Sequence, residues 1–128
     1  MIGFYWSKGR IKEMGEYKAG VKNGLWCFYN EFGYMVEKGY YVDGNKEGVW
    51  REFDGFNHKI KEGVCQKGYR VGRWVSWYFS GEIRQEEEYG NGNDGRVLGV
   101  CWKKTKWSLS GEFHTRYLDF RVVAIPSG

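Results

Sequence analysis

The sequence predicts an all-β protein, and three features carry that prediction. Of the 128 residues, 20 are glycine and 20% are aromatic, whereas a single residue is proline. Glycine costs a helix interior about 1 kcal/mol relative to alanine but fits readily into tight turns. The third feature is a spacing of 24 residues between Trp26, Trp50 and Trp74. Together these features indicate short aromatic strands joined by frequent glycine turns.

Several further columns of like residues keep the 24-residue period. A fixed period of this length is the signature of a repeat protein whose units stack on one another. We therefore assign residues 1–92 to the repeats, with residues 2–92 carrying the period. The columns are Gly20, Gly44, Gly68 and Gly92; Gly24, Gly48 and Gly72; Tyr17, Tyr41, Cys65 and Tyr89; Tyr29, Phe53 and Trp77; and Gly15, Gly39, Gly63 and Glu87.

Within each unit the composition predicts two strands and two turns. GVKNG at 20–24 and NEFG at 30–33 are typical of hairpin turns, where glycine and asparagine tolerate positive φ. Between them, Trp26 and Phe28 alternate with Leu25, Cys27 and Tyr29, which is the period of a strand. We expect an elongated, twisted antiparallel meander of hairpins.

The register of these hairpins follows if both loops contain four residues. Tyr17 would then lie opposite Trp26, and Trp26 would lie opposite Glu37, with the odd-numbered residues 35–41 on the tryptophan face. Gly15, Gly39 and Gly63 would interrupt strands, where glycine is normally unfavourable. We expect an aromatic ring from the neighbouring strand to cover the bare backbone at each of these glycines.

Residues 93–128 break the period and are expected to be a degenerate repeat or a capping tail. WSLSGEF at 107–113 resembles WYFSGEI at 77–83 with a displacement of 30 residues. The stretch NDGRVLGVCWKK would then bulge out, and YLDFRVVAI would form a closing strand. Such a segment would cover the open edge of the repeat sheet.

The aligned segments resemble MORN repeats, particularly the bacterial variant. The segments that carry the resemblance are GLWCFY at 24–29, YVDGNKEGVW at 41–50 and QKGYRVGRW at 66–74. The resemblance implies a twisted sheet of successive hairpins used as a binding or assembly module; some members are antitoxin-like, and phospholipid recognition has been proposed for others. RVLGVCW and FRVVAI also resemble, faintly, the end of formylglycine-generating-enzyme and C-type-lectin-like domains, a likeness that transfers no active site.

Composition and charge exclude several functional classes. The net charge is only +4, and the acidic segments 25–48 and 73–95 would repel a nucleic-acid backbone. Cys27, Cys65 and Cys101 are odd in number and far apart, which argues against a disulfide framework or a zinc site. With no signal-peptide-like opening and no apolar run of membrane-spanning length, we expect a cytoplasmic protein in a reducing compartment.

The chain also has few residues that could perform catalysis. His58 and His114 occupy variable positions and are expected to be surface residues. Glu86, Glu87 and Glu88 are expected to lie solvated on an edge strand, where charge blocks unwanted strand pairing. The sequence therefore predicts a protein that is not an enzyme and has neither a cofactor nor a small-molecule substrate.

Two binding hypotheses remain. Lys22, Lys46 and Arg70 share one position in the repeat, so they would line one margin of the sheet, either as ordinary solvated turn residues or as contacts to anionic lipid. The face opposite the tryptophans is rich in apolar residues and would need a partner protein or a second copy to cover it. We expect protein contacts there from Tyr29, Tyr40, Phe53, Val64 and Trp77. Protein–protein interaction is the first hypothesis and peripheral lipid binding the alternative.

Overall fold

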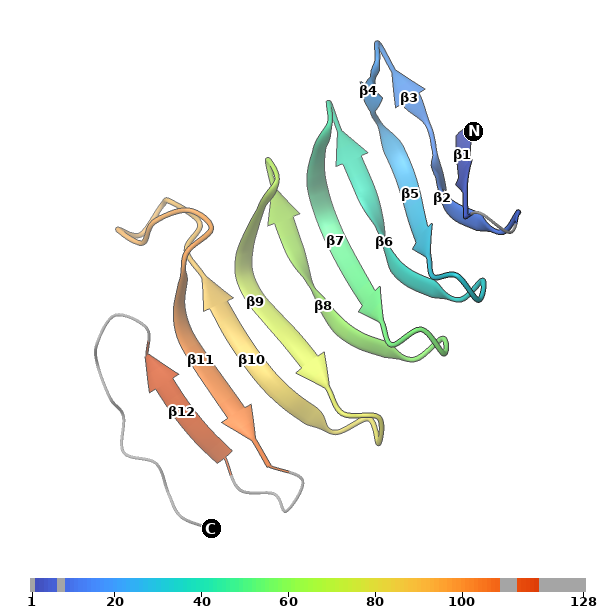
Figure 1. Ribbon diagram of the computed structural model, residues 1–128. Helices are drawn as coiled ribbons and strands as arrows, with labels where there is room; N and C mark the ends of the chain where they lie inside the picture. The colour runs from blue at the N-terminus through green and yellow to red at the C-terminus, as the bar shows by residue number, and fades with distance from the viewer. Residues whose placement is uncertain (1, 7–8, 109–112, 118–128) are drawn as a thin grey trace.

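Consecutive hairpins build one long antiparallel sheet in the computed structural model of the chain (Figure 1). The structure describes residues 2–6, 9–108 and 113–117. All regular secondary structure in these residues is β. The strands are β1 (Ile2–Tyr5), β2 (Ile11–Gly15), β3 (Tyr17–Lys18), β4 (Val21–Lys22), β5 (Gly24–Tyr29), β6 (Met35–Val42), β7 (Asn45–Phe53), β8 (Lys59–Gln66), β9 (Tyr69–Trp77), β10 (Ile83–Tyr89), β11 (Cys101–Trp107) and β12 (Phe113–Tyr117).

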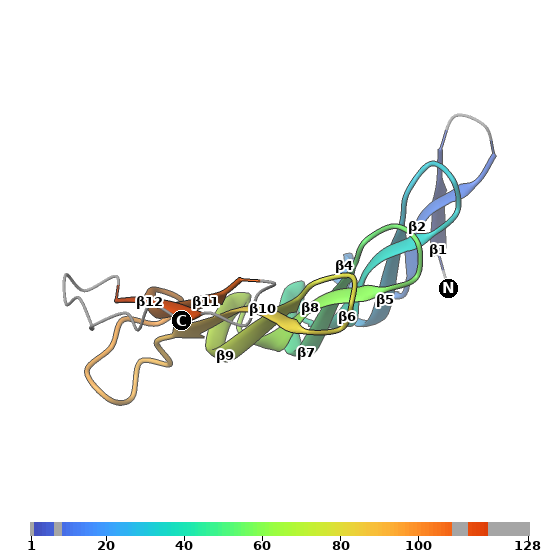
Figure 2. The same ribbon diagram turned by 90° about the horizontal axis from the view of Figure 1, so that it is seen from below.

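The strand order follows the chain order, as in a meander. Ten strands pair in the sequence β1-β2-β5-β6-β7-β8-β9-β10-β11-β12, while β3 and β4 form the separate tip of the β2–β5 hairpin. Viewed from below, the sheet is one layer thick, elongated and twisted (Figure 2). The predicted all-β, antiparallel meander is therefore confirmed.

One set of turns is tighter than the four-residue loops that the sequence predicts. Lys18 pairs with Val21, and Val42 pairs with Asn45, so these hairpins have two-residue loops. Both loop residues have positive φ, for example Asp43 at 50° and Gly44 at 85°. That geometry is the type I′ turn, whose twist matches that of the flanking strands.

The predicted register is wrong by a few residues at both ends of the hairpins. At one end the turns are short and glycine bulges follow them; at the other end the loop has three residues and a bulge lies between Phe28 and Tyr29. Tyr17 pairs with Lys22, and Trp26 lies opposite Gly39 rather than Glu37. After each two-residue turn, a glycine with positive φ opens a bulge: Tyr40 pairs with Glu47, but the adjacent Gly39 pairs with Trp50. The bulge places two additional residues on the tryptophan-bearing strand.

The turns at the opposite end of the hairpins have a different geometry. Asn30 donates its backbone N–H to the carbonyl of Tyr34, which encloses a three-residue loop that ends with Gly33 at a φ of 88°. The equivalent residue in the next unit is Asn57, with a φ of 69°. Asparagine tolerates this left-handed conformation better than other non-glycine residues. The departure from glycine at position 57 therefore preserves the turn.

Three tryptophans form the core of this single-layer sheet. Trp26, Trp50 and Trp74 expose 0%, 1% and 3% of their surface. Each indole lies directly over a strand glycine: a Cβ added to Gly15, Gly39 or Gly63 would come within about 2.2 Å of the ring. Each ring nitrogen also donates a hydrogen bond to a backbone carbonyl, that of Glu16, Tyr40 and Val64 respectively. The expected covering of glycine by aromatic rings is confirmed.

The C-terminal segment adds two strands to the sheet. A loop containing Gly92, Gly95 and Gly99, all with positive φ, leads from β10 into β11. Lys104 on β11 lies opposite Glu87 on β10, and Glu87 also lies opposite Trp74. Lys104 therefore occupies the position that Trp74 has in the preceding unit. The two residues are 30 positions apart, which is also the displacement between WYFSGEI and WSLSGEF. Most of the expected closing strand YLDFRVVAI, residues 118–125, falls outside the described residues, whereas β12 ends at Tyr117.

Candidate interaction surfaces

The three repeated cations lie over the indole rings. Lys22 Nζ is 4.6 Å from the Trp26 ring centroid and Lys46 Nζ is 4.3 Å from that of Trp50. The Arg70 guanidinium carbon is 4.3 Å from the centroid of Trp74. The expectation that these residues are solvated turn cations is therefore wrong, because they belong to strands and fold back over the negative faces of the rings.

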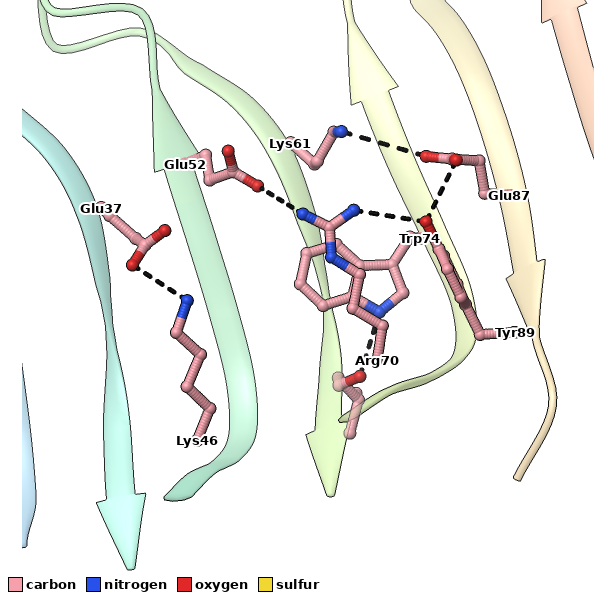
Figure 3. Close-up of polar contacts among 9 residues, drawn as sticks. Glu37, Lys46, Glu52, Lys61, Arg70, Trp74, Glu87 and Tyr89 are labelled. Carbon is pink, nitrogen blue, oxygen red and sulfur yellow. Dashed lines mark hydrogen bonds and ion pairs between the residues drawn. The ribbon is translucent and has the colours of Figure 1, made fainter. Parts of the chain in front are cut away.

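A carboxylate accompanies each of these cations. Lys22 Nζ lies 3.4 Å from Glu13, and Lys46 Nζ lies 3.1 Å from Glu37. In the next unit the residue at the position of Glu37 is Lys61, which would repel the cation. Arg70 turns instead to Glu52, 3.3 Å away, as Figure 3 shows. Arg70 thus has the same repeat position as Lys22 and Lys46, but it pairs with a carboxylate from a different position of the repeat.

Tyrosines pack against the indoles with their rings nearly perpendicular. Tyr41 contacts the rings of Trp26 and Trp50 at interplanar angles of 81° and 87°. Edge-to-face packing of this kind places the positive ring edge against the negative ring face. Burial, with the nearby Glu37 and Glu13 carboxylates, raises the pKa of Tyr41 to about 12. This phenol therefore stays protonated at neutral pH.

Where the tryptophan column ends, a charged network replaces it (Figure 3). Glu87 is buried and lies 3.5 Å from Lys104 Nζ and 3.9 Å from Lys61 Nζ. The Tyr89 hydroxyl donates to Glu87 at 3.1 Å and accepts a hydrogen bond from Arg70 at 3.3 Å. The expectation of a solvated edge-strand glutamate is wrong at Glu87, because β10 lies between β9 and β11. The residue opposite Glu87 on β11 is Lys104 rather than a fourth tryptophan. Because no indole covers position 87, a side chain larger than that of glycine fits at this position.

Glu87 is ionised in this network. Burial by itself would raise the pKa of the carboxyl, but the Tyr89 hydrogen bond and the Lys104 and Lys61 ammonium groups together hold it below the usual 4.5. A carboxylate with a lowered pKa is poorly suited to act as a general acid at neutral pH. At neutral pH it is an anion that links β10 to Lys61 on β8 and Lys104 on β11.

The Glu87 network should make the free energy of unfolding depend on pH in the acidic range. A carboxyl whose folded pKa is lowered contributes stability that is complete above its unfolded pKa, near 4.5, and disappears as pH falls through the folded value. We expect Glu87→Gln to reduce the free energy of unfolding by about 1–2 kcal/mol at pH 7. The variant should also lose less stability than the wild type below pH 4.5. Urea titrations at several pH values measure both effects, with exposed Glu31→Gln as the control.

The opposite face of the sheet presents the apolar side chains that the sequence indicated. Tyr40 exposes 55% of its surface and Val64 exposes 42%, and Val49 pairs with Val64 across β7 and β8. Tyr29, Phe53 and Trp77 are half-buried. A shallow groove of about 350 Å³ joins two of the five expected contact residues, Val64 and Trp77. Its lining is Val49, Glu62, Gly63, Val64, Arg73, Val75, Trp77 and Ile83, and it contains neither Tyr29, Tyr40 nor Phe53.

Ion pairs border this groove. Arg51 Nε lies 2.5 Å from Glu62, and Arg73 contacts Glu86. The hydrogen bond to Glu86 raises the pKa of Arg73. An apolar centre with a charged border is the usual anatomy of a protein interface. We name this surface the valine face, defined by Tyr40, Val42, Val49, Val64 and the groove.

A second hollow, of about 560 Å³, was not indicated by the sequence. Glu52, Lys61 and Ser76 line it from positions where the repeat changes residue type, since Phe28 occupies the position of Glu52 and Ser76. Changes of residue type within a repeat column were the sequence signal that could have indicated this hollow. The other lining residues are Asp54, Ile60, Trp77, Tyr78, Phe79, Arg84 and Gln85. Charged side chains of both signs lie beside aromatic ones in this lining, so the recess is of mixed polar and apolar character.

The remaining reactive residues have ordinary surroundings. Burial raises the pKa of the Cys65 and Cys101 thiols, so both are protonated at neutral pH. His58 Nδ1 lies 3.1 Å from Asp54, whereas the His114 side chain lies outside the described residues. Among the residues that the structure covers, none of the His, Cys, Asp and Glu side chains form a group of three able to hold a metal ion. No helix in that part of the chain is long and apolar enough to cross a membrane.

Comparisons of the chain with protein-family models, with curated proteins and with solved structures find no match.

Proposed function

We propose that this chain is a MORN-like, non-enzymatic module that binds a protein through the valine face, with a second copy of the chain as one such partner. The observation that supports the proposal is the exposed apolar surface of Tyr40, Val42, Val49 and Val64 beside the groove. An apolar surface bordered by ion pairs excludes water well once a partner covers it. The tryptophan face is less suited to this role, because its indoles are already covered by cations and tyrosines.

The ion pairs count against the alternative of anionic lipid binding through Lys22, Lys46 and Arg70. Each cation lies over an indole and near a carboxylate. A lipid headgroup would have to compete with both contacts, while one cation near an anionic surface contributes only about 1 kcal/mol. Flotation with phosphatidylserine vesicles at two salt concentrations tests this alternative; salt-sensitive binding would support it.

Val64→Asp should abolish binding at the valine face. A carboxylate at the groove would be desolvated on docking without a partner, which is costly. The side chain is already well exposed, so the free chain should remain folded. We would measure self-association by sedimentation velocity and stoichiometric capture of a partner on the immobilised chain. Lys67→Asp, in an exposed turn, is the matched control. Wild-type protein that neither self-associates nor captures a partner would contradict the proposal, as would a Val64→Asp variant that binds as well as the wild type.

A further inference from the structure

One row of side chains beside the valine face changes the sign of its charge part-way across the sheet. Each residue of the row pairs with the next on adjacent strands from β6 to β10, so all of them point to the same face. The cations are Lys38 on β6 and Arg51 on β7. The anions are Glu62 on β8 and Glu86 on β10, and Val75 on β9 lies between them. The sign therefore changes at the boundary between β7 and β8, near the middle of the sheet (Figure 1).

The two charges next to this boundary are accessible. The Arg51 side chain exposes 44% of its surface and that of Glu62 exposes 29%, although the two form an ion pair. Glu62 also lies 3.3 Å from Lys59, but a carboxylate has about four lone-pair sites and accepts from several donors. The Arg51 guanidinium likewise has more N–H groups than one carboxylate uses. Both side chains can therefore bind charged groups of another molecule.

The apolar row next to these charges is symmetrical about the same boundary. Val49 on β7 lies opposite Val64 on β8, and the two expose 41% and 42% of their surface. Each valine is two positions from Arg51 or Glu62 along its strand, so it lies on the same face. Crossing the boundary therefore exchanges valine for valine but cation for anion.

This pattern is complementary to itself under a two-fold rotation. When two copies face each other and the axis runs along the β7–β8 boundary, β7 of one copy packs over β8 of the other. Val49 then meets Val64 of the second copy, and Arg51 meets Glu62 of the second copy. Each contact occurs twice, as in any isologous interface. The two ion pairs form a square of alternating charge, in which each group keeps its own neighbour and gains another.

The twist of the sheet leaves this arrangement intact, because the contacts lie on the two strands next to the axis. Facing sheets usually pack with their strands about 30° apart, and the resulting misalignment grows with distance from the axis. Farther along the charged row, Lys38 would lie over Val75 and would meet no cation.

The same charges count against other kinds of partner. A partner surface of one charge sign would place a like charge over either Arg51 or Glu62, which is costly. A wholly apolar partner would desolvate both groups without adding an opposite charge. A second copy presents the opposite charge to each of them.

We propose that two copies of the chain form a face-to-face dimer through the valine face, with the two-fold axis along the β7–β8 boundary. The dimer rests on the proposed function of the valine face and names its partner. Val49 and Val64 provide the apolar contact. The crossed pairs of Arg51 and Glu62 determine the orientation, which is a usual role of charge at an interface.

Two charge reversals test this arrangement when they are mixed. Arg51→Glu places two anions at the boundary and Glu62→Arg places two cations there, so each variant repels its own copies. In the mixture, the new carboxylate of one chain faces the new guanidinium of the other, and the unchanged Glu62 faces the unchanged Arg51. Both variants have lost the ion pair within the chain, so association of the mixture reports contacts between chains.

Sedimentation equilibrium measures the outcome. We expect the wild type to dimerise with a Kd below about 100 µM and the equimolar mixture to associate within about threefold of that value. Each reversal by itself should weaken dimerisation at least about tenfold. Lys67→Glu and Glu31→Arg make the same charge changes in exposed turns and should each dimerise as the wild type does. Circular dichroism checks that all the variants are folded.

A variant that carries both reversals restores the ion pair within the chain, with its direction inverted. It should dimerise with itself, because each new charge again faces its opposite. It should not associate with the wild type, since carboxylate would then face carboxylate and guanidinium would face guanidinium. Sedimentation of this variant mixed with a fluorescently labelled wild type distinguishes the two outcomes, even where a single reversal fails to fold.

Three results would overturn the dimer. They are a wild-type chain that stays monomeric, single reversals that dimerise as well as the wild type, and a doubly reversed variant that associates with the wild type. The proposed function fails separately. A monomeric wild-type chain that captures a different protein, and loses it on Val64→Asp, would retain the valine face as an interaction surface and overturn the dimer alone.

Discussion

Gly39→Ala should destabilise the protein by about 3 kcal/mol, near the upper end of the usual cost of overpacking. A Cβ at position 39 would lie 2.2 Å from Cδ2 of Trp50 and 2.3 Å from Cε2. The indole has nowhere to move, because its nitrogen is bonded to the Tyr40 carbonyl and Lys46 lies over its ring. Urea unfolding followed by far-UV circular dichroism measures the loss.

Gly3→Ala is the matched control for this change. Gly3 is also a strand residue without positive φ, and its Cβ would meet its nearest neighbour, Tyr5, at an ordinary 3.5 Å. We expect no loss of stability there, and a small gain is possible because alanine restricts the unfolded chain. If both variants unfolded at the same urea concentration, the covering of glycine by indole would not be a determinant of this fold.

Trp50→Ala should cost about 3–5 kcal/mol, the range found when large aromatic residues are removed from protein cores. The loss combines three contributions: the buried indole itself, its hydrogen bond to Tyr40, and the edge-to-face contact with Tyr41. Native proteins are stable by only about 5–15 kcal/mol, so this single change should remove a large part of the total. Thermal unfolding followed by circular dichroism is the appropriate measurement, because the substitution also removes a fluorophore.

Phe32→Ala provides the comparison for Trp50→Ala. This ring is large but mostly exposed, so its removal should change the free energy of unfolding by less than about 0.5 kcal/mol. A similar loss in both variants would mean that the tryptophan column contributes no more than surface aromatics do. A large loss at Trp50 alone would place the stability of the sheet in its buried rings.

The changes along the repeat columns are linked through space. Where β11 carries Lys104 in place of an indole, the glycine of the preceding strand becomes Glu87, and the two side chains pair. Where Glu37 becomes Lys61 in the next unit, Phe28 becomes Glu52, and Arg70 pairs with that carboxylate. In each case a substitution that looks like decay of the repeat is matched by a second one on a neighbouring strand.

The period of the sequence determined the fold class, the hairpin unit and the identity of the core. It also placed the tryptophans and the glycines that they cover on one face, with Tyr40, Val49 and Val64 on the other, even though the register was wrong. Trp26 lies opposite Gly39 rather than Glu37, a slip of two residues. Side chains alternate with a period of two along a strand, so an even slip leaves the residues between the bulges on their expected face. The faces were therefore robust to an error in loop length.

Only the tertiary structure decided which side chains meet across strands. Lys22, Lys46 and Arg70 share a column in the sequence, but the fold over the indoles depends on bulges at glycines that hydrophobic periodicity does not reveal. The burial of Glu87 depended on β11 pairing outside it, after a loop that breaks the period. The ring contacts of Tyr34 with Phe56 and of His58 with Phe79, likewise, exist because separate turns are brought side by side. Spacing along a chain determines local periodicity and face, whereas contacts between strands depend on bulges and loop lengths summed over the whole sheet.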